Sequence, residues 1–156
     1  MPKQLSKPYR RKISNALSGI AGEYLVAAEL SRRGYIASVT LRNTQGIDIL
    51  ASDVQATKSV GIQVKTNQKG HKRWLMNQKA ERLHGANLFY VFVALREDRS
   101  SFHVVHSKDV AKHINKSHRT WLKTPGKRGQ AHHDSNLRLF EDKKDIFLNR
   151  WDLLGL

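Results

Sequence analysis

Hydrophobic and polar positions follow two periods along the chain, one of strands and one of helices. Residues 35–41, 46–52, 59–66, 87–95 and 101–107 have the alternation or short apolar run typical of β-strands. The segment SNALSGIAGEYLVAAELSRRG has helical spacing; Ser14 or Asn15 suits its N-cap and Gly34 its end. Two more helices are expected, over residues 77–84 and from about residue 108 to 118, the second capped by Ser107. This order predicts an α/β fold, a mixed β-sheet flanked by helices.

The length fits one folded domain that follows a short tail. The first 12 of the 156 residues hold five basic residues, two prolines and little that can be buried, so we expect a flexible basic arm over residues 1–13 and a single domain over 14–156. No apolar run approaches the ~20 residues of a membrane span, and no membrane association is expected. The chain has no cysteine, which excludes disulfides and thiolate metal sites and fits a cytoplasmic protein.

Charge is the strongest feature of the composition. Lys and Arg number 28 against 13 Asp and Glu, a formal net charge of +15. Such a field attracts polyanions, and nucleic acid is the leading partner. A ribosome-associated protein and an acidic membrane surface are the alternatives, although the sequence offers no basic amphipathic helix with an aromatic or Leu face.

An acid, an amide and an amine occupy alternate positions of two neighbouring strands. Side chains in a strand point to opposite faces in turn, so Asp48 leaves the face of Ile47 and Ile49, and Gln63 and Lys65 leave the face of Ile62 and Val64; the segments are GIDIL and IQVKT. If the apolar faces of the two strands coincide, Asp48, Gln63 and Lys65 converge. The alternative is that Gln63 and Lys65 are the solvated face of a half-exposed sheet.

The first helix places a second acid within an apolar row. Ile20, Glu23, Ala27 and Leu30 share a helix face. A carboxylate buried there without a partner would cost several kcal/mol, so a cation, a hydrogen-bond network or Lys65 should compensate. Alternatively, Glu23 lies at the rim and pairs with Arg32 or Arg33, while Glu29 is ordinary surface.

Together these residues resemble the active site of the PD-(D/E)XK nucleases, the restriction-endonuclease-like superfamily. In that family a helix Glu precedes a hairpin that carries Asp and then (D/E/Q)-X-Lys; here these are Glu23, Asp48 and Gln63-Val64-Lys65. GEYLVAAELSRRGY, GIDIL and IQVKT look most like the archaeal Holliday-junction resolvases and the Mrr-type nucleases, and the resemblance covers about residues 19–67. It implies an α-β-β-β-α-β core and a homodimer that acts on DNA.

The resemblance also implies roles for individual residues. Glu23, Asp48, Gln63 and Lys65 would be catalytic. Asp48, Gln63, the backbone carbonyl of Val64 and Glu23 would hold Mg²⁺, with Mn²⁺ as a substitute. Two positions depart from the family pattern. Ile47 replaces a Pro that supplies no ligand, and Gln63 replaces the commoner carboxylate, which should weaken metal binding and raise the Mg²⁺ requirement.

Other basic residues lie in loops that suit contacts with DNA phosphates. They are Lys69, Lys72 and Arg73 after the third strand, and Lys123, Lys127 and Arg128 in KTPGKRG. A solvated loop would look the same. Trp121, Phe140, Phe147 and Trp151 are interpreted as packing anchors, and His132-His133-Asp134 is a weaker rival metal motif.

Two functions of different class therefore remain. The first is a Mg²⁺-dependent endodeoxyribonuclease that hydrolyses DNA phosphodiester bonds; junctions, flaps, modified duplex and long homing sites all suit its core. The second is a non-catalytic nucleic-acid-binding protein on a degenerate nuclease fold.

Overall fold

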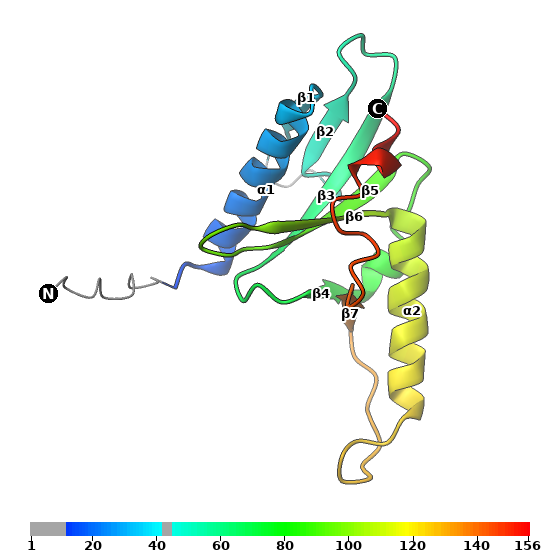
Figure 1. Ribbon diagram of the computed structural model, residues 1–156. Coiled ribbons are helices and arrows are strands. Elements are labelled where there is room, and N and C mark those ends of the chain that lie inside the picture. The colour runs from blue at the N-terminus through cyan, green and yellow to red at the C-terminus, as the bar shows by residue number, and fades with distance from the viewer. Residues whose placement is uncertain (1–11, 42–44) are drawn as a thin grey trace, which may run out of the picture.

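The apolar strands assemble into a mixed five-stranded sheet with a helix on each side (Figure 1). The computed structural model describes residues 12–41 and 45–156. Its elements, with η for a 3₁₀ helix, are α1 (Asn15–Arg32), β1 (Ile36–Val39), β2 (Ile49–Ser52), β3 (Ser59–Asn67), β4 (Arg73–Asn77), η1 (Gln78–Glu81), β5 (Leu88–Ala94), β6 (Ser101–His106), α2 (Ser107–Lys123), β7 (Leu137–Glu141) and η2 (Trp151–Leu154). The strand order is β1-β2-β3-β5-β6, in which only β3 and β5 run parallel, and β4 and β7 form a separate antiparallel pair. The predicted fold class is confirmed.

Helix α1 begins and ends at the predicted signals. The hydroxyl of Ser14 accepts a hydrogen bond from Leu17 N–H at 3.1 Å, and Gly34 follows the helix with a φ of 87°, which favours glycine. Its buried row is Ser18, Gly22, Val26 and Leu30. Of the predicted row, Leu30 is buried, whereas Ile20, Glu23 and Ala27 are half-buried beside the true buried row.

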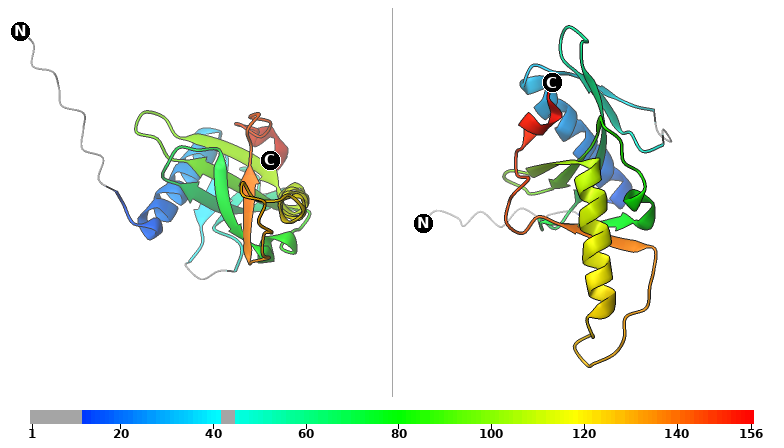
Figure 2. Two further views of the ribbon diagram at one scale, coloured as in Figure 1. Left: turned by 90° about the horizontal axis from the view of Figure 1, so that it is seen from below. Right: turned by 90° about the vertical axis from the view of Figure 1, so that its right-hand side faces the viewer.

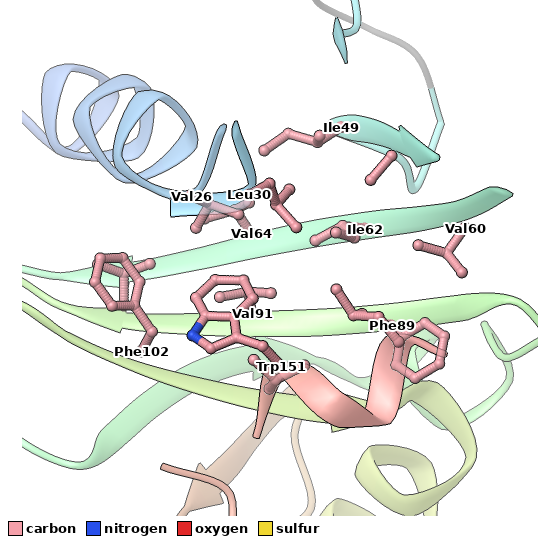
Figure 3. Packing of buried hydrophobic residues seen from close by; sticks show 14 residues of the cluster. Val26, Leu30, Ile49, Val60, Ile62, Val64, Phe89, Val91, Phe102 and Trp151 are labelled. Atoms are coloured by element: carbon pink, nitrogen blue, oxygen red, sulfur yellow. The ribbon is translucent and has the colours of Figure 1, made fainter. Parts of the chain in front are cut away.

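One face of the sheet packs against α1 and η2. The close view shows Val26 and Leu30 of α1 above Ile62 and Val64 of β3, with Trp151 of η2 on the same side (Figure 3). Ile49 and Ala51 of β2 belong to the same buried cluster. The apolar faces of β2 and β3 thus coincide at Ile49 and Ile62. Ile47, which was predicted to share the face of Ile49, instead lies against Gly61 on the opposite face.

The other face packs against α2, η1 and the β4–β7 pair. Tyr90 and Phe92 of β5 are fully buried there. Phe92 stacks on Phe140 of β7 with centroids 4.2 Å apart, and the indole N–H of Trp74 donates to the carbonyl of Val93 at 2.9 Å. This second core positions β4 and β7 over the sheet.

Several element predictions need correction. Strands β4 and β7 were not predicted, the helix expected over 77–84 is the four-residue η1, and α2 continues to Lys123. His106, rather than Ser107, caps α2 by accepting from Lys108 N–H at 3.2 Å. Ser107 is buried and exchanges two 3.1 Å hydrogen bonds with the backbone of Gly85.

The two ends of the described chain lie apart, and the long α2 extends past the sheet (Figure 2). The predicted basic arm falls almost wholly outside the described residues, which begin at Lys12. Across 12–41 and 45–156, no helix has both the length and the apolar character to cross a membrane.

Candidate metal and nucleic-acid site

Strand β3 extends beyond β2, and Asp48 lies where the two separate. The ladder with β2 covers Ser59 to Ile62, whereas the ladder with β5 continues to Asn67. Gly46, with a φ of 75°, turns the chain into this position. The edge of β3 beyond Ile62 is therefore available to side chains instead of a backbone partner.

Hydrogen bonds from both its backbone and its side chain fix Asp48 at this edge. Its N–H donates to the carbonyl of Ile62 at 2.8 Å, and its carbonyl accepts from Thr40 N–H at 2.9 Å. Its carboxylate accepts from Val64 N–H at 2.7 Å. The Asp48 side chain thus replaces the missing β2 partner of Val64, the residue between Gln63 and Lys65.

The carbonyl of Val64 is turned to the same edge as the Asp48 carboxylate. Within a strand, the N–H and C=O of one residue point the same way. The Ile62 carbonyl accepts a hydrogen bond from Asp48 N–H, and the Val64 N–H donates one to the Asp48 carboxylate. The backbone hydrogen bonds of Gly61 and Asn67 instead point to the opposite side, toward β5. A carboxylate and a backbone carbonyl are hard oxygen donors of the kind that Mg²⁺ prefers.

Gln63 and Lys65 point to the face of the second core, as predicted. They are in register with Tyr90 and Phe92 on the parallel strand β5, and both are half-buried. The hydroxyl of Tyr90 is buried and lacks a hydrogen-bond partner among the described residues. Burial, and next the nearby Asp48 carboxylate, raise the pKa of Tyr90 to about 12.

Glu23 is held close to β3 by the glycine that precedes it. A Cβ added to Gly22 would lie 1.9 Å from the hydroxyl oxygen of Thr66, so helix and strand touch at this point. Glu23 follows Gly22 along the helix, and Lys65 precedes Thr66 along the strand. The contact brings this turn of α1 directly against β3.

Glu29 forms ion pairs with two arginines at the end of α1. It pairs with Arg32 at 3.0 Å and with Arg33, and the hydrogen bond from Arg32 leads the causes that lower the pKa of Glu29. Glu29 is thus a half-buried surface residue that is held by its own helix. The guanidinium of Arg33 also lies 4.6 Å from the centre of the Trp151 ring.

A second group of metal-ligand types was not found from the sequence. His103, Asp142 and Asp145 place ligand atoms within 4.8 Å of one another, a spacing that a divalent cation could bridge. His103 Nδ1 is 2.7 Å from Asp142, whose oxygens also accept from Ile146 N–H and Phe147 N–H at 2.9 Å each. These bonds tie β6 to residues 142–147, so the group also has a structural role. His103 lies 39 positions before Asp142, so no local pattern joins it to the two aspartates.

The basic residues predicted to contact phosphate differ in whether they already pair with an acid. Lys72 pairs with Asp145, and Arg73 pairs with Glu141 at 2.6 Å, so both already have acidic partners. Lys69 is exposed. Lys123, Lys127 and Arg128 are exposed at the end of α2 and in the following loop.

The structure agrees with most of the predictions for the aromatic residues but not with the histidine metal motif. Phe140 and Trp151 are buried and Phe147 is partly buried, as expected of packing anchors, but Trp121 is 42% exposed and stacks on His132 with centroids 4.1 Å apart. Within the described ranges, His132, His133 and Asp134 do not form a metal-ligand group. Asp134 instead accepts a hydrogen bond from His118 Nε2 at 2.7 Å.

Comparison with known proteins supports the fold independently. No family model matches the chain, and neither does any curated protein. Among solved structures, the chain shares the fold of a nuclease, the bacterial homing endonuclease I-Ssp6803I. The TM-score is 0.53, with 17% identity over 92% of this chain and 94% of that one.

Proposed function

We propose that this protein is a Mg²⁺-dependent endodeoxyribonuclease of the PD-(D/E)XK type. The observation that carries the proposal is the hydrogen bond from Val64 N–H to the Asp48 carboxylate, because it fixes the acid on the strand that bears Gln63 and Lys65. The net charge of +15 and the fold shared with a homing endonuclease support it.

Each residue then has a distinct chemical task. Asp48, the amide oxygen of Gln63 and the Val64 carbonyl would hold Mg²⁺ or Mn²⁺, with Glu23 as a direct ligand or one acting through water. A divalent ion there supplies charge neutralisation at the phosphate and an activated water. The ammonium of Lys65 orients that water and offsets charge developing on the phosphate oxygens.

The substrate is DNA, and two kinds fit. The sequence resemblance favours a branched junction, and the homing endonuclease fold favours a specific duplex site. Symmetric cutting of two strands needs two sites, so we propose a homodimer. Sedimentation velocity should then give twice the mass of 17.8 kDa.

The test is cleavage by the wild type beside Asp48→Ala. Supercoiled plasmid and a synthetic four-way junction are incubated with each protein in Mg²⁺ and then Mn²⁺, and circular dichroism confirms that both proteins fold. The wild type should cut, and Asp48→Ala and Lys65→Ala should not. Cleavage that survives in Asp48→Ala would refute the assignment of the site.

Gln63 favours one alternative, a protein that binds nucleic acid without cutting it. An amide holds a hard cation less strongly than the usual carboxylate does. Intact, salt-dependent DNA binding with no cleavage by the wild type in either metal would support this second function.

A further inference from the structure

Helix α2 carries a continuous basic stripe on the side away from the core. The stripe consists of Lys108, Lys112, Lys116, Arg119 and Lys123, all exposed. At 100° per residue these five positions fall within about 80° of the helix circumference, opposite the buried Val110 and Ile114.

In the part of the chain that the structure describes, no acid forms an ion pair with this stripe. Residues 108–136 hold seven Lys or Arg, and only Asp109 and Asp134 are acidic. Asp134 is engaged by His118. None of the ion pairs formed within 12–41 and 45–156 includes a member of the stripe.

The stripe lies on an ordered projection. The last turns of α2 and the loop after it extend beyond the β4–β7 pair (Figures 1 and 2). The Trp121–His132 stack and the His118–Asp134 bond hold this loop against the helix. The loop therefore presents Lys127 and Arg128 next to the end of the stripe.

We propose that the α2 stripe is a second DNA contact surface, which binds the phosphate backbone of duplex DNA without reading its sequence. Its length of about 22 Å, at 1.5 Å per residue, matches about six base-pair steps of duplex. The identity of the polyanion rests on the proposed function, but the binding requires neither a metal nor cleavage. A membrane surface fits less well, because the apolar side of α2 is buried against the sheet.

The test compares two variants that lose the same charge. One is Lys112→Gln with Lys116→Gln and Arg119→Gln, and the control is Lys58→Gln with Arg99→Gln and Lys144→Gln, whose positions are exposed elsewhere. Fluorescence anisotropy with a labelled duplex is measured in EDTA at several salt concentrations, and thermal melts confirm folding. Neither variant touches the residues assigned to the metal.

The stripe variant should lower the slope of log K against log salt by about two to three units, close to 0.9 per lost phosphate contact. Its affinity at physiological salt should fall at least tenfold, while the control changes the slope by less than about one. Equal losses in the two variants, no loss in the stripe variant, or a loss confined to duplex RNA or anionic vesicles would overturn the inference. A wild type that binds duplex but never cuts would refute the proposed function and leave this inference standing.

Discussion

The hydroxyl of Tyr90 is a buried polar group close to the Asp48 carboxylate, and it lacks a hydrogen-bond partner among the described residues. Tyr90→Phe removes only that oxygen, so the free energy of unfolding should stay the same or rise by up to about 1 kcal/mol. Urea denaturation at neutral pH measures the change. A loss of stability would mean that the hydroxyl contributes to the fold.

The same residue predicts a dependence on alkaline pH. Because folding raises the pKa of Tyr90 from 10.0 to about 12, the unfolded chain loses this proton first. The free energy of unfolding is therefore independent of Tyr90 ionisation below pH 10 and falls as pH rises toward 12. Two pKa units correspond to about 3 kcal/mol. Urea denaturation across this range should show that Tyr90→Phe loses less stability than the wild type.

Gln63 should set the metal requirement. Gln63→Glu adds a negative charge beside Asp48 and should lower the Mg²⁺ concentration for half-maximal cleavage by about tenfold. A Mg²⁺ titration of the initial cleavage rate measures this. Gln55→Glu adds the same charge on the exposed β2–β3 turn and should change nothing; an equal shift there would show that net charge is the cause.

The alternation assigned the faces of Ile49, Ile62 and Val64 correctly, whereas the buried face of α1 was misjudged. Alternation with a period of two leaves little freedom, so the faces of Ile49, Ile62 and Val64 were predicted correctly. A helix face is broad, and Gly22 belongs to the buried row because a close backbone approach, which hydrophobicity does not reveal, is needed there. The hydrogen bond from Val64 to Asp48 depends on where β2 ends, which no residue pattern marks.

Among the elements, the contact between α1 and β3 depends on Gly22. Gly22→Ala places a methyl group against Thr66 and should cost about 1–3 kcal/mol of stability. It should also reduce cleavage, because Glu23 shifts with the helix. Thermal and urea unfolding measure the first effect, and plasmid cleavage the second.

The matched control lies one turn earlier on the same helix. A Cβ at Gly19 meets nothing within 4 Å, so Gly19→Ala should stabilise α1 by up to about 1 kcal/mol through helix propensity. If both variants destabilised equally, helix packing at Thr66 would not be the cause.

The elements around α2 are joined by Glu81. It pairs with the buried Arg138 of β7 and accepts from Asn115 of α2 at 3.2 Å. Glu81→Gln leaves the Arg138 guanidinium buried without a charged partner on η1, and should cost about 3 kcal/mol in urea denaturation. A change below about 0.5 kcal/mol would contradict a role for this pair.

The Glu81 pair also predicts a response to acid. Burial works against ionisation of Glu81, but the hydrogen bonds from Arg138 and Asn115 outweigh it and lower its pKa below 4.5. The stability that the carboxylate provides is therefore present above pH 4.5 and is lost as pH falls below it. Thermal melts of Glu81→Gln should lack this component of the acid-induced loss.

The elements missed from the sequence share a cause. Strands β4 and β7 have five residues each, and every partner of one comes from the other, 60 or more positions away. Their short, partly charged segments carry no local signal that distinguishes them from loops. Helix α2 runs on to Lys123 because His118 and Trp121 pack against the returning loop, a tertiary contact that periodicity does not contain.

For the whole molecule, composition and alternation were enough to predict one mixed sheet with helices on both sides. Composition and alternation did not predict that β4 and β7 cover the second face of the sheet. They also did not predict that α2 projects beyond it. The strands of the five-stranded sheet show strong period-two alternation, whereas the β4–β7 pair is assembled from distant parts of the chain.

Because β7 lies near the end of the chain, the second core is completed late in biosynthesis. Trp74 and Phe92 are synthesised long before Phe140. The ring of Phe140 must stack on Phe92 to complete the second core. Until β7 emerges from the ribosome, aromatic side chains on one face of the five-stranded sheet are exposed to solvent. The edge of β4 also remains unpaired. A nascent chain stalled ahead of residue 137 should therefore depend on chaperones more strongly than the complete chain does.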